Sequence, residues 1–166
     1  MTTALAALRE RLAQVADLNY VMMGLEWDHQ VIMPPRGARG RAEVQATLQT
    51  IAHERFVDDE VGRLIDAARA EVDGADPDSF EASLVRVAAR DWDKARRVPG
   101  ELKAELARAG TIGYEAWTRA RAESDFASFA PHLKRMLELK ARYVECFDGF
   151  ACAYDVLLVE IGRAHV

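Results

Sequence analysis

The apolar positions of this chain recur at spacings of three, four and seven residues, which places them on one face of an α-helix. Five stretches show this pattern, at residues 3–30, 38–70, 79–97, 100–124 and 129–158. No stretch of convincing length alternates apolar and polar residues as a half-buried strand does. The pattern therefore predicts an all-α fold of about five long helices joined by Pro/Gly turns.

Proline and glycine mark where the predicted helices end. Pro34 and Pro35 cannot both lie inside a helix, because each lacks a backbone N–H and its ring clashes with the preceding turn. The segment 72–79, VDGADPDS, is predicted as a loop. Residues 57–62 are a weak point in the second predicted helix. A glycine and an acidic run there either kink that helix or begin a new one, whose first turn favours negative charge.

We expect residues 129–158 to form the longest unbroken helix, with Ser128 as its N-cap and Pro131 in its first turn. Cys146 and Cys152 would then lie on that helix and point in different directions, so they cannot easily form a disulfide. We interpret both as reduced, small core residues of a cytoplasmic protein.

Composition narrows the class of protein. The chain has 166 residues, of which 50% are hydrophobic and 30% charged, as is ordinary for a soluble domain with its own core. The net charge is −5 and no basic block stands out, so nucleic acid is not an expected partner. No run of about 18 apolar residues predicts a membrane span. The charges of Arg9, Glu10 and Arg11 argue against a signal peptide.

The nearest approach to a metal motif is the sequence HERFV, which begins at His53 and Glu54. A zincin helix needs HExxH, because residues four apart place both imidazoles on one face around the metal. Here Val57 stands where the second histidine would be. We therefore interpret His53 as a surface or groove histidine and not as a ligand.

The other polar and aromatic candidates give no catalytic set. Tyr20, Glu26 and His29 could share a helix face, but one carboxylate and one imidazole do not hold a metal, and we expect His132 to be exposed. The tryptophans are interpreted as core or interhelix anchors, with a ligand cage as the alternative; they are Trp27, Trp92 and Trp117.

An arginine cluster follows the tandem prolines, formed by Arg36, Arg39 and Arg41. These side chains either bind an anion near the start of the second helix, where the helix dipole favours negative charge, or are simply solvated or salt-bridged. We favour the second interpretation. We therefore assign no catalytic, cofactor-binding or metal residue to this chain.

A set of short motifs runs through the chain. The first part contains Trp27-Asp28, Met33-Pro34, Gly37-Ala38, Arg41-Ala42-Glu43 and His53-Glu54. The later part contains Val98-Pro99, Glu101-Leu102, Trp117, Ala120-Arg121, Asp125-Phe126, Phe129, Pro131, Leu133, Tyr154-Asp155 and Leu157-Leu158. In this order they resemble the carboxypeptidase Taq family of metallocarboxypeptidases over nearly all of residues 18–158.

The resemblance implies that residues 1–160 are the N-terminal helical region of a larger, mostly helical zincin-type metallopeptidase. Such an enzyme is expected to be cytoplasmic and homodimeric, and to release C-terminal amino acids from peptides with zinc or a similar divalent metal. The family's HExxH helix comes after the part that this chain resembles. No catalytic or metal residue therefore carries over, and we expect this chain alone to bind no metal and to be inactive.

Residues 161–166, IGRAHV, have a separate interpretation. They are the in-frame translation of ATC GGA AGA GCA CAC GTC, a string found in a widely used sequencing adapter, whose next triplet, TGA, is a stop. We expect this tail to derive from the adapter, so His165 is not counted as a ligand.

Two alternatives to the peptidase fragment remain open. One is a stand-alone helical interaction module without catalytic activity, which an HExxH further along the gene would exclude. The other is a small metal-binding four-helix protein. It ranks last, because it needs Glu-x-x-His pairs on two facing helices and the sequence has this spacing only once, at Glu26 and His29.

Overall fold

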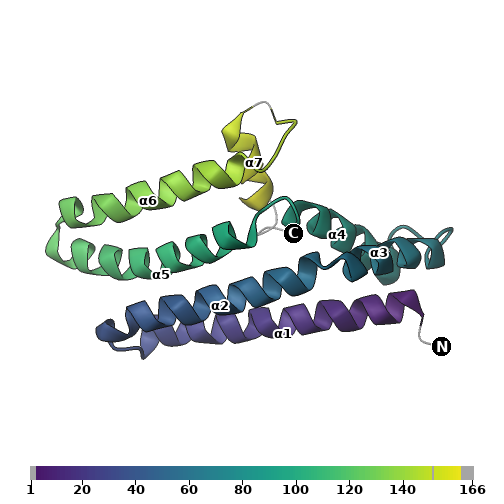
Figure 1. The fold of residues 1–166 in the computed structure, drawn as a ribbon, viewed down its shortest axis with the longest axis horizontal. Helices are drawn as coiled ribbons and strands as arrows, with labels where there is room; N and C mark the ends of the chain where they lie inside the picture. The colour runs from purple at the N-terminus through teal and green to yellow at the C-terminus, as the bar shows by residue number, and fades with distance from the viewer. Residues whose placement is uncertain (1–2, 151, 162–166) are drawn as a thin grey trace. The chain divides into compact units, whose positions relative to one another are not determined.

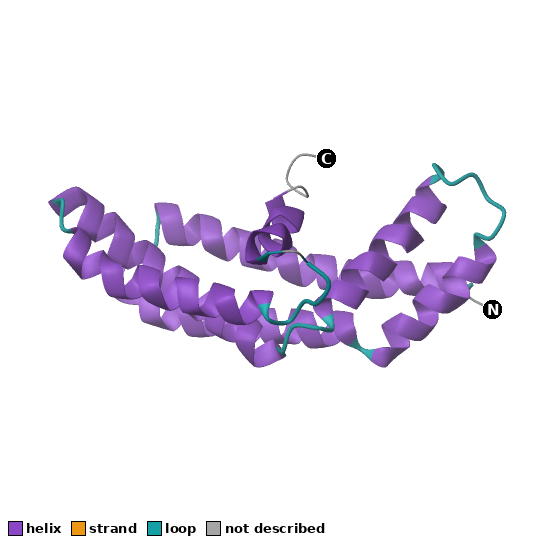
Figure 2. Ribbon diagram, turned by 90° about the horizontal axis from the view of Figure 1, so that it is seen from above, coloured by secondary structure: helices purple, strands orange, loops and turns teal. Residues whose placement is uncertain are grey.

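The computed structural model describes residues 3–150 and 152–161, and these form helices and connecting segments without any strand (Figures 1 and 2). The predicted all-α class is confirmed for this part of the chain. Its α-helices outnumber the five predicted, because two of the predicted helices are each split. The elements are α1 (Ala4–Val31), η1 (Pro35–Gly37), α2 (Ala38–Val57), α3 (Asp59–Glu71), α4 (Phe80–Ala95), α5 (Gly100–Glu123), α6 (Phe126–Val144) and α7 (Ala153–Ile161).

The first helix ends where the tandem prolines require it. The Thr3 hydroxyl caps α1 by accepting a hydrogen bond from the Ala6 N–H at 3.2 Å. The chain leaves α1 at Ile32, and Pro34 is extended, with φ −64° and ψ 146°. A Cβ at Gly37 would lie 3.0 Å from the Met33 Cγ, so this tight turn favours glycine.

The second predicted helix is two helices, as the acidic run allowed. Asp58 lies between α2 and α3, and its carboxylate accepts a hydrogen bond from the Glu60 N–H at 2.7 Å. Asp59 and Glu60 then occupy the first turn of α3, where the helix dipole favours negative charge. The break falls inside the weak point predicted at residues 57–62, and the interpretation as a new helix is the correct one.

The prediction of one helix over residues 129–158 is wrong. Asp125, not Ser128, is the N-cap of α6, and its carboxylate accepts a hydrogen bond from the Ser128 N–H at 3.2 Å. Pro131 consequently lies inside the helix and not in its first turn. The helix ends at Val144, and Gly149 has φ +84°, a conformation that side chains other than glycine rarely adopt.

The two cysteines are therefore not on one helix. Cys146 follows α6, is half-buried, and its Sγ lies 3.3 Å from the Arg142 carbonyl oxygen. Cys152 precedes α7 and is exposed, so its assignment to the core is wrong. Both are free thiols.

The chain divides into two compact units, each with its own core. The first unit comprises residues 1–32 and 47–96. Within it α3 packs against both α1 and α4. Its buried core consists of Leu8, Val61, Ile65, Ala68, Val85, Ala88 and Ala89.

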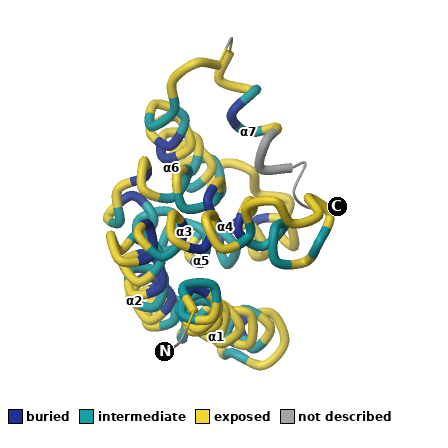
Figure 3. Tube along the Cα trace, turned by 90° about the vertical axis from the view of Figure 1, so that its right-hand side faces the viewer, coloured by how far each residue is buried: buried dark blue, intermediate teal, exposed yellow. Residues whose placement is uncertain are grey.

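The second unit comprises residues 33–46 and 97–166, and α2 therefore contributes to both units. Here α5 and α6 form an antiparallel hairpin (Figure 1), and α7 packs against α6. Figure 3 shows one short buried segment in α7. The buried core consists of Val98, Leu102, Leu139, Tyr143 and Val156.

Polar contacts hold the second unit's helices in register. The buried Thr111 hydroxyl on α5 donates to the Gln45 side-chain oxygen near the start of α2. The Glu105 carboxylate on α5 accepts hydrogen bonds from Arg135 at 2.7 Å and from Arg142 at 2.9 Å, both on α6. These ion pairs are half-exposed, so they add specificity to the hairpin more than stability.

We expect Gly62→Ala to destabilise the first unit by about 1–2 kcal/mol, because its Cβ would lie 2.6 Å from the Trp92 ring. Gly24→Ala is the matched control, since nothing lies within 4 Å of a Cβ there. Within a helix it should stabilise by about 0.5–1 kcal/mol. Urea unfolding followed by circular dichroism measures both. Equal stabilisation by the two substitutions would show that α3 and α4 do not pack through this glycine.

We expect Glu71→Gln to destabilise the first unit by about 0.5–1 kcal/mol. The Glu71 carboxylate, at the end of α3, accepts hydrogen bonds from the first backbone N–H groups of α1, at 2.6 Å from Ala4 and 3.2 Å from Leu5. Glu10→Gln is the control, because Glu10 is exposed on α1 and makes no such contact. Equal urea midpoints for the two variants would contradict this role for Glu71.

Candidate functional site

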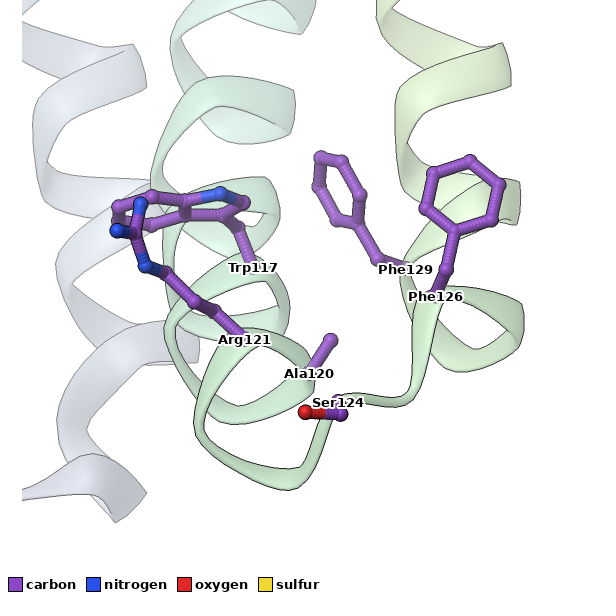
Figure 4. Close-up of a pocket in the computed structure, with 6 residues that line it drawn as sticks. All are labelled: Trp117, Ala120, Arg121, Ser124, Phe126 and Phe129. Atoms are coloured by element: carbon purple, nitrogen blue, oxygen red, sulfur yellow. The ribbon is translucent and has the colours of Figure 1, made fainter.

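A hollow lined by aromatic side chains and one arginine lies at the end of the α5–α6 hairpin (Figure 4). Its volume is about 380 Å³. Trp117, Ala120 and Arg121 line it from α5, and Phe126 and Phe129 line it from α6. Ser124 lines it from the turn between the two helices. We refer to it as the aromatic hollow.

The turn between the helices fixes the geometry of the aromatic hollow. Ser124 adopts the left-handed conformation, with φ 56° and ψ 32°, which is uncommon for a residue with a Cβ. The Asp125 N–H donates to the Ala120 carbonyl at 2.8 Å, and Asp125 then caps α6. This tight reversal places Phe126 and Phe129 beside the last turns of α5.

Aromatic and cationic groups dominate the lining. The Arg121 guanidinium carbon lies 5.4 Å from the centre of the Trp117 ring, a cation–π arrangement that Figure 4 shows. The Phe126 and Phe129 rings meet edge to face with centres 6.4 Å apart. The hollow thus offers flat apolar faces beside one positive charge. Such a lining suits an apolar or aromatic group of a ligand. It provides no general base or metal ligand for hydrolysis.

A second hollow of about 270 Å³ continues along the hairpin. It shares Trp117 and Phe129 with the aromatic hollow and extends past Gly110 and Gly113 on α5 to Leu133 and Met136 on α6. The two glycines lack side chains, and nothing lies within 4 Å of a Cβ built at either, so the α5 side of this hollow remains open. Together the hollows form an apolar groove along the hairpin.

The histidines considered in the sequence have different surroundings. His53 is buried on α2 and not on the surface, while Glu54 beside it is exposed. His29 is buried near the end of α1, with its Nδ1 3.8 Å from the Glu26 carboxylate. His132 is half-buried and lines the second hollow, so the expectation of an exposed side chain is wrong.

The arginines after the tandem prolines differ in exposure. Arg36 and Arg39 are exposed and Arg41 is half-buried. The favoured interpretation as solvated or salt-bridged side chains stays a prediction, because exposure alone does not distinguish it from an anion site.

The tryptophans have different environments. Trp92 packs against the core of the first unit, with Arg96 over its ring at 4.5 Å. Trp27 is 60% exposed and Trp117 is 39% exposed, so neither is a core anchor, and the interpretation as interhelix anchors stays a prediction for both. The hollow around Trp117 was not found from the sequence pattern. The sequence feature that could have indicated this hollow is the Phe-x-x-Phe spacing directly after the turn at Asp125.

The described residues do not fit a metal centre. No group of three or more histidine, cysteine, aspartate or glutamate side chains in residues 3–150 and 152–161 is arranged to hold a metal ion. A catalytic zinc site uses three protein ligands and an open position. No hydrolytic step can therefore be derived from this part of the chain.

Two solved structures share this arrangement of helices. The structure named BsuCP matches 93% of this chain and 31% of its own chain with a TM-score of 0.86 at 22% identity, which shows the shared fold. The carboxypeptidase of Pyrococcus furiosus matches 95% of this chain and 31% of its own, with a TM-score of 0.72 at 26% identity. The described helices thus have the fold of one part of a carboxypeptidase.

The chain belongs to the carboxypeptidase Taq (M32) metallopeptidase family, whose family model matches residues 7–164. Thermostable carboxypeptidase 1 of Thermus thermophilus is 31% identical over 72% of this chain, and that of Pyrococcus furiosus is 31% identical over 81%. The matched parts are 23% and 26% of those proteins. The resemblance read from the motifs is confirmed, and the chain spans about a quarter of the length of these relatives.

We expect Phe129→Ala to destabilise the second unit by about 2 kcal/mol, because Phe129 is half-buried between the two hollows. Phe126→Ala is the matched control. Its ring is 67% exposed, so we expect a cost below about 0.5 kcal/mol. Urea unfolding measures both, and equal costs would contradict the different burial of the two rings.

Proposed function

We propose that this chain is the N-terminal helical part of a metal-dependent carboxypeptidase that releases C-terminal amino acids from peptides. The observation that carries the proposal is the family match over residues 7–164. Two relatives named thermostable carboxypeptidase 1 add support, and each is about four times as long as the matched part, which is 23% or 26% of its length.

In this proposal the described helices form part of the scaffold and one wall of the substrate groove. The catalytic residues lie in the rest of the enzyme. The metal ligands, an HExxH pair and a third carboxylate, lie outside this chain. Zinc or a similar divalent ion would activate the attacking water there. The part spanned here is inactive alone.

The cellular setting of the enzyme is part of the same proposal. We infer a cytoplasmic homodimer that acts on peptides and uses neither nucleic acid nor a membrane. The mixed charges and the net charge of −5 support the lack of a nucleic acid partner. None of the described helices has the length and apolar character needed to cross a bilayer.

A stand-alone interaction module is the second candidate, and one observation favours it. The α5–α6 groove and the neighbouring face of α6 expose large apolar groups, including Phe126 and Leu137. Exposed apolar patches often mark interaction sites. The uninterrupted gene separates the two candidates, because only the peptidase requires an HExxH after residue 160.

We expect the purified 166-residue chain with added zinc to release no amino acid from blocked dipeptide or longer peptide substrates. The polypeptide encoded by the uninterrupted gene should release C-terminal residues, and a chelator should abolish that release. Amino acid release is measured by mass spectrometry. Metal-dependent release by the 166-residue chain, or a complete gene product without HExxH, would refute the proposed function.

A further inference from the structure

Apolar side chains cover more of the circumference of α6 than packing against one neighbouring helix requires. Positions on a helix advance by about 100° per residue. Leu139 and Tyr143 form the buried side of α6. Phe126, Leu133 and Leu137 lie within about 40° of one another, and about 100–140° round the helix from that buried side.

This second set of apolar residues, which we call the outer stripe, is exposed. The exposed fractions are 67% for Phe126, 36% for Leu133 and 61% for Leu137. Phe129 and Met136 lie on the helix between the outer stripe and the buried side, and they line the hollows. The outer stripe and the groove are therefore one continuous apolar face, next to the contact between α5 and α6.

The spacing of the outer stripe suits a helix as the occupant. Residues 126, 133 and 137 are separated by seven and four positions, the repeat with which one helix packs along another. Lys134 and Lys140 flank the stripe and are exposed. An occupant that carries carboxylates along its edges would complement these two charges.

The length of the relatives indicates where that occupant comes from. The BsuCP chain and the Pyrococcus furiosus carboxypeptidase chain are each matched over 31% of their length, so more than two thirds of each lies outside the part matched here. A helix in the same polypeptide is present at a high effective concentration and needs no separate partner.

We propose that the outer stripe and groove of the α5–α6 hairpin are an internal docking face, covered by an amphipathic, acid-edged helix of the same polypeptide from the region after residue 161. This inference rests on the proposed function, since both require the longer polypeptide. It adds a specific surface and the kind of element that covers it.

The test compares the 166-residue chain with the polypeptide encoded by the uninterrupted gene. Leu137→Gln removes an apolar group from the outer stripe while keeping a good helix former. It should lower the melting temperature of the complete polypeptide by about 3 °C or more and change that of the 166-residue chain by less than about 1 °C. Hydroxyl-radical oxidation of Phe126 and Leu137 should be several-fold slower in the complete polypeptide.

Glu138→Gln is the control. Glu138 is the next residue on α6, about 100° further round the helix and exposed, and it should leave both melting temperatures within about 1 °C. A loss of stability with Leu137→Gln in both proteins would mean that the 166-residue chain covers the stripe itself. No loss in either would mean that nothing covers it. Either result overturns the docking face.

Two further outcomes also overturn the inference. If protection of Phe126 and Leu137 disappears on dilution to the monomer, the occupant is a second copy. If the uninterrupted gene ends at residue 166, no occupant exists in the polypeptide. Peptidase activity is measured separately. An active enzyme with an unprotected stripe refutes the docking face alone, and an inactive, HExxH-free polypeptide with a protected stripe refutes the proposed function alone.

Discussion

The unsatisfied N–H groups at helix starts constrain this structure more than any other single feature. Each helix leaves its first backbone donors without internal partners, and short polar side chains supply the missing acceptors. Thr3, Asp58, Ser79 and Asp125 do so for α1, α3, α4 and α6. Glu71 reaches the start of α1 from the end of α3, so one carboxylate both satisfies a helix end and joins two helices of the first unit.

Side-chain packing then determines how much of the apolar surface of these helices is buried within each unit. In the first unit α3 and α4 pack closely, because Gly62 leaves room for the Trp92 ring between them. The second unit does not close in the same way. The hairpin buries Leu139 and Tyr143, but it leaves Trp117, Phe126 and Leu137 exposed. Apolar area left in water contributes nothing to folding, and this surface is what a scaffold portion of a longer enzyme would present.

The helix periodicity predicted element types well and some ends poorly. It located the break at Pro34 and Pro35, because proline acts through its own ring and missing donor whatever surrounds it. It failed across residues 145–150, where apolar residues continue at helical spacing while the backbone turns at Gly149 with φ +84°. Hydrophobic spacing carries no information about a single φ angle. The aromatic hollow was missed for a related reason, since it depends on the reversal at Ser124 and Asp125, which brings two helices together.

By itself the sequence determined the all-α class and the helix breaks at the prolines and at the acidic cap. It also determined the membership in the carboxypeptidase Taq family and the incomplete HExxH at His53. All of these depend on residue identity and local spacing. Only the tertiary structure decided which apolar groups are buried. Trp92 packs into a core while Trp27 and Trp117 remain exposed, although all three lie on amphipathic helices. Burial needs a partner surface supplied from elsewhere in the fold, and residue spacing along one helix does not specify that partner.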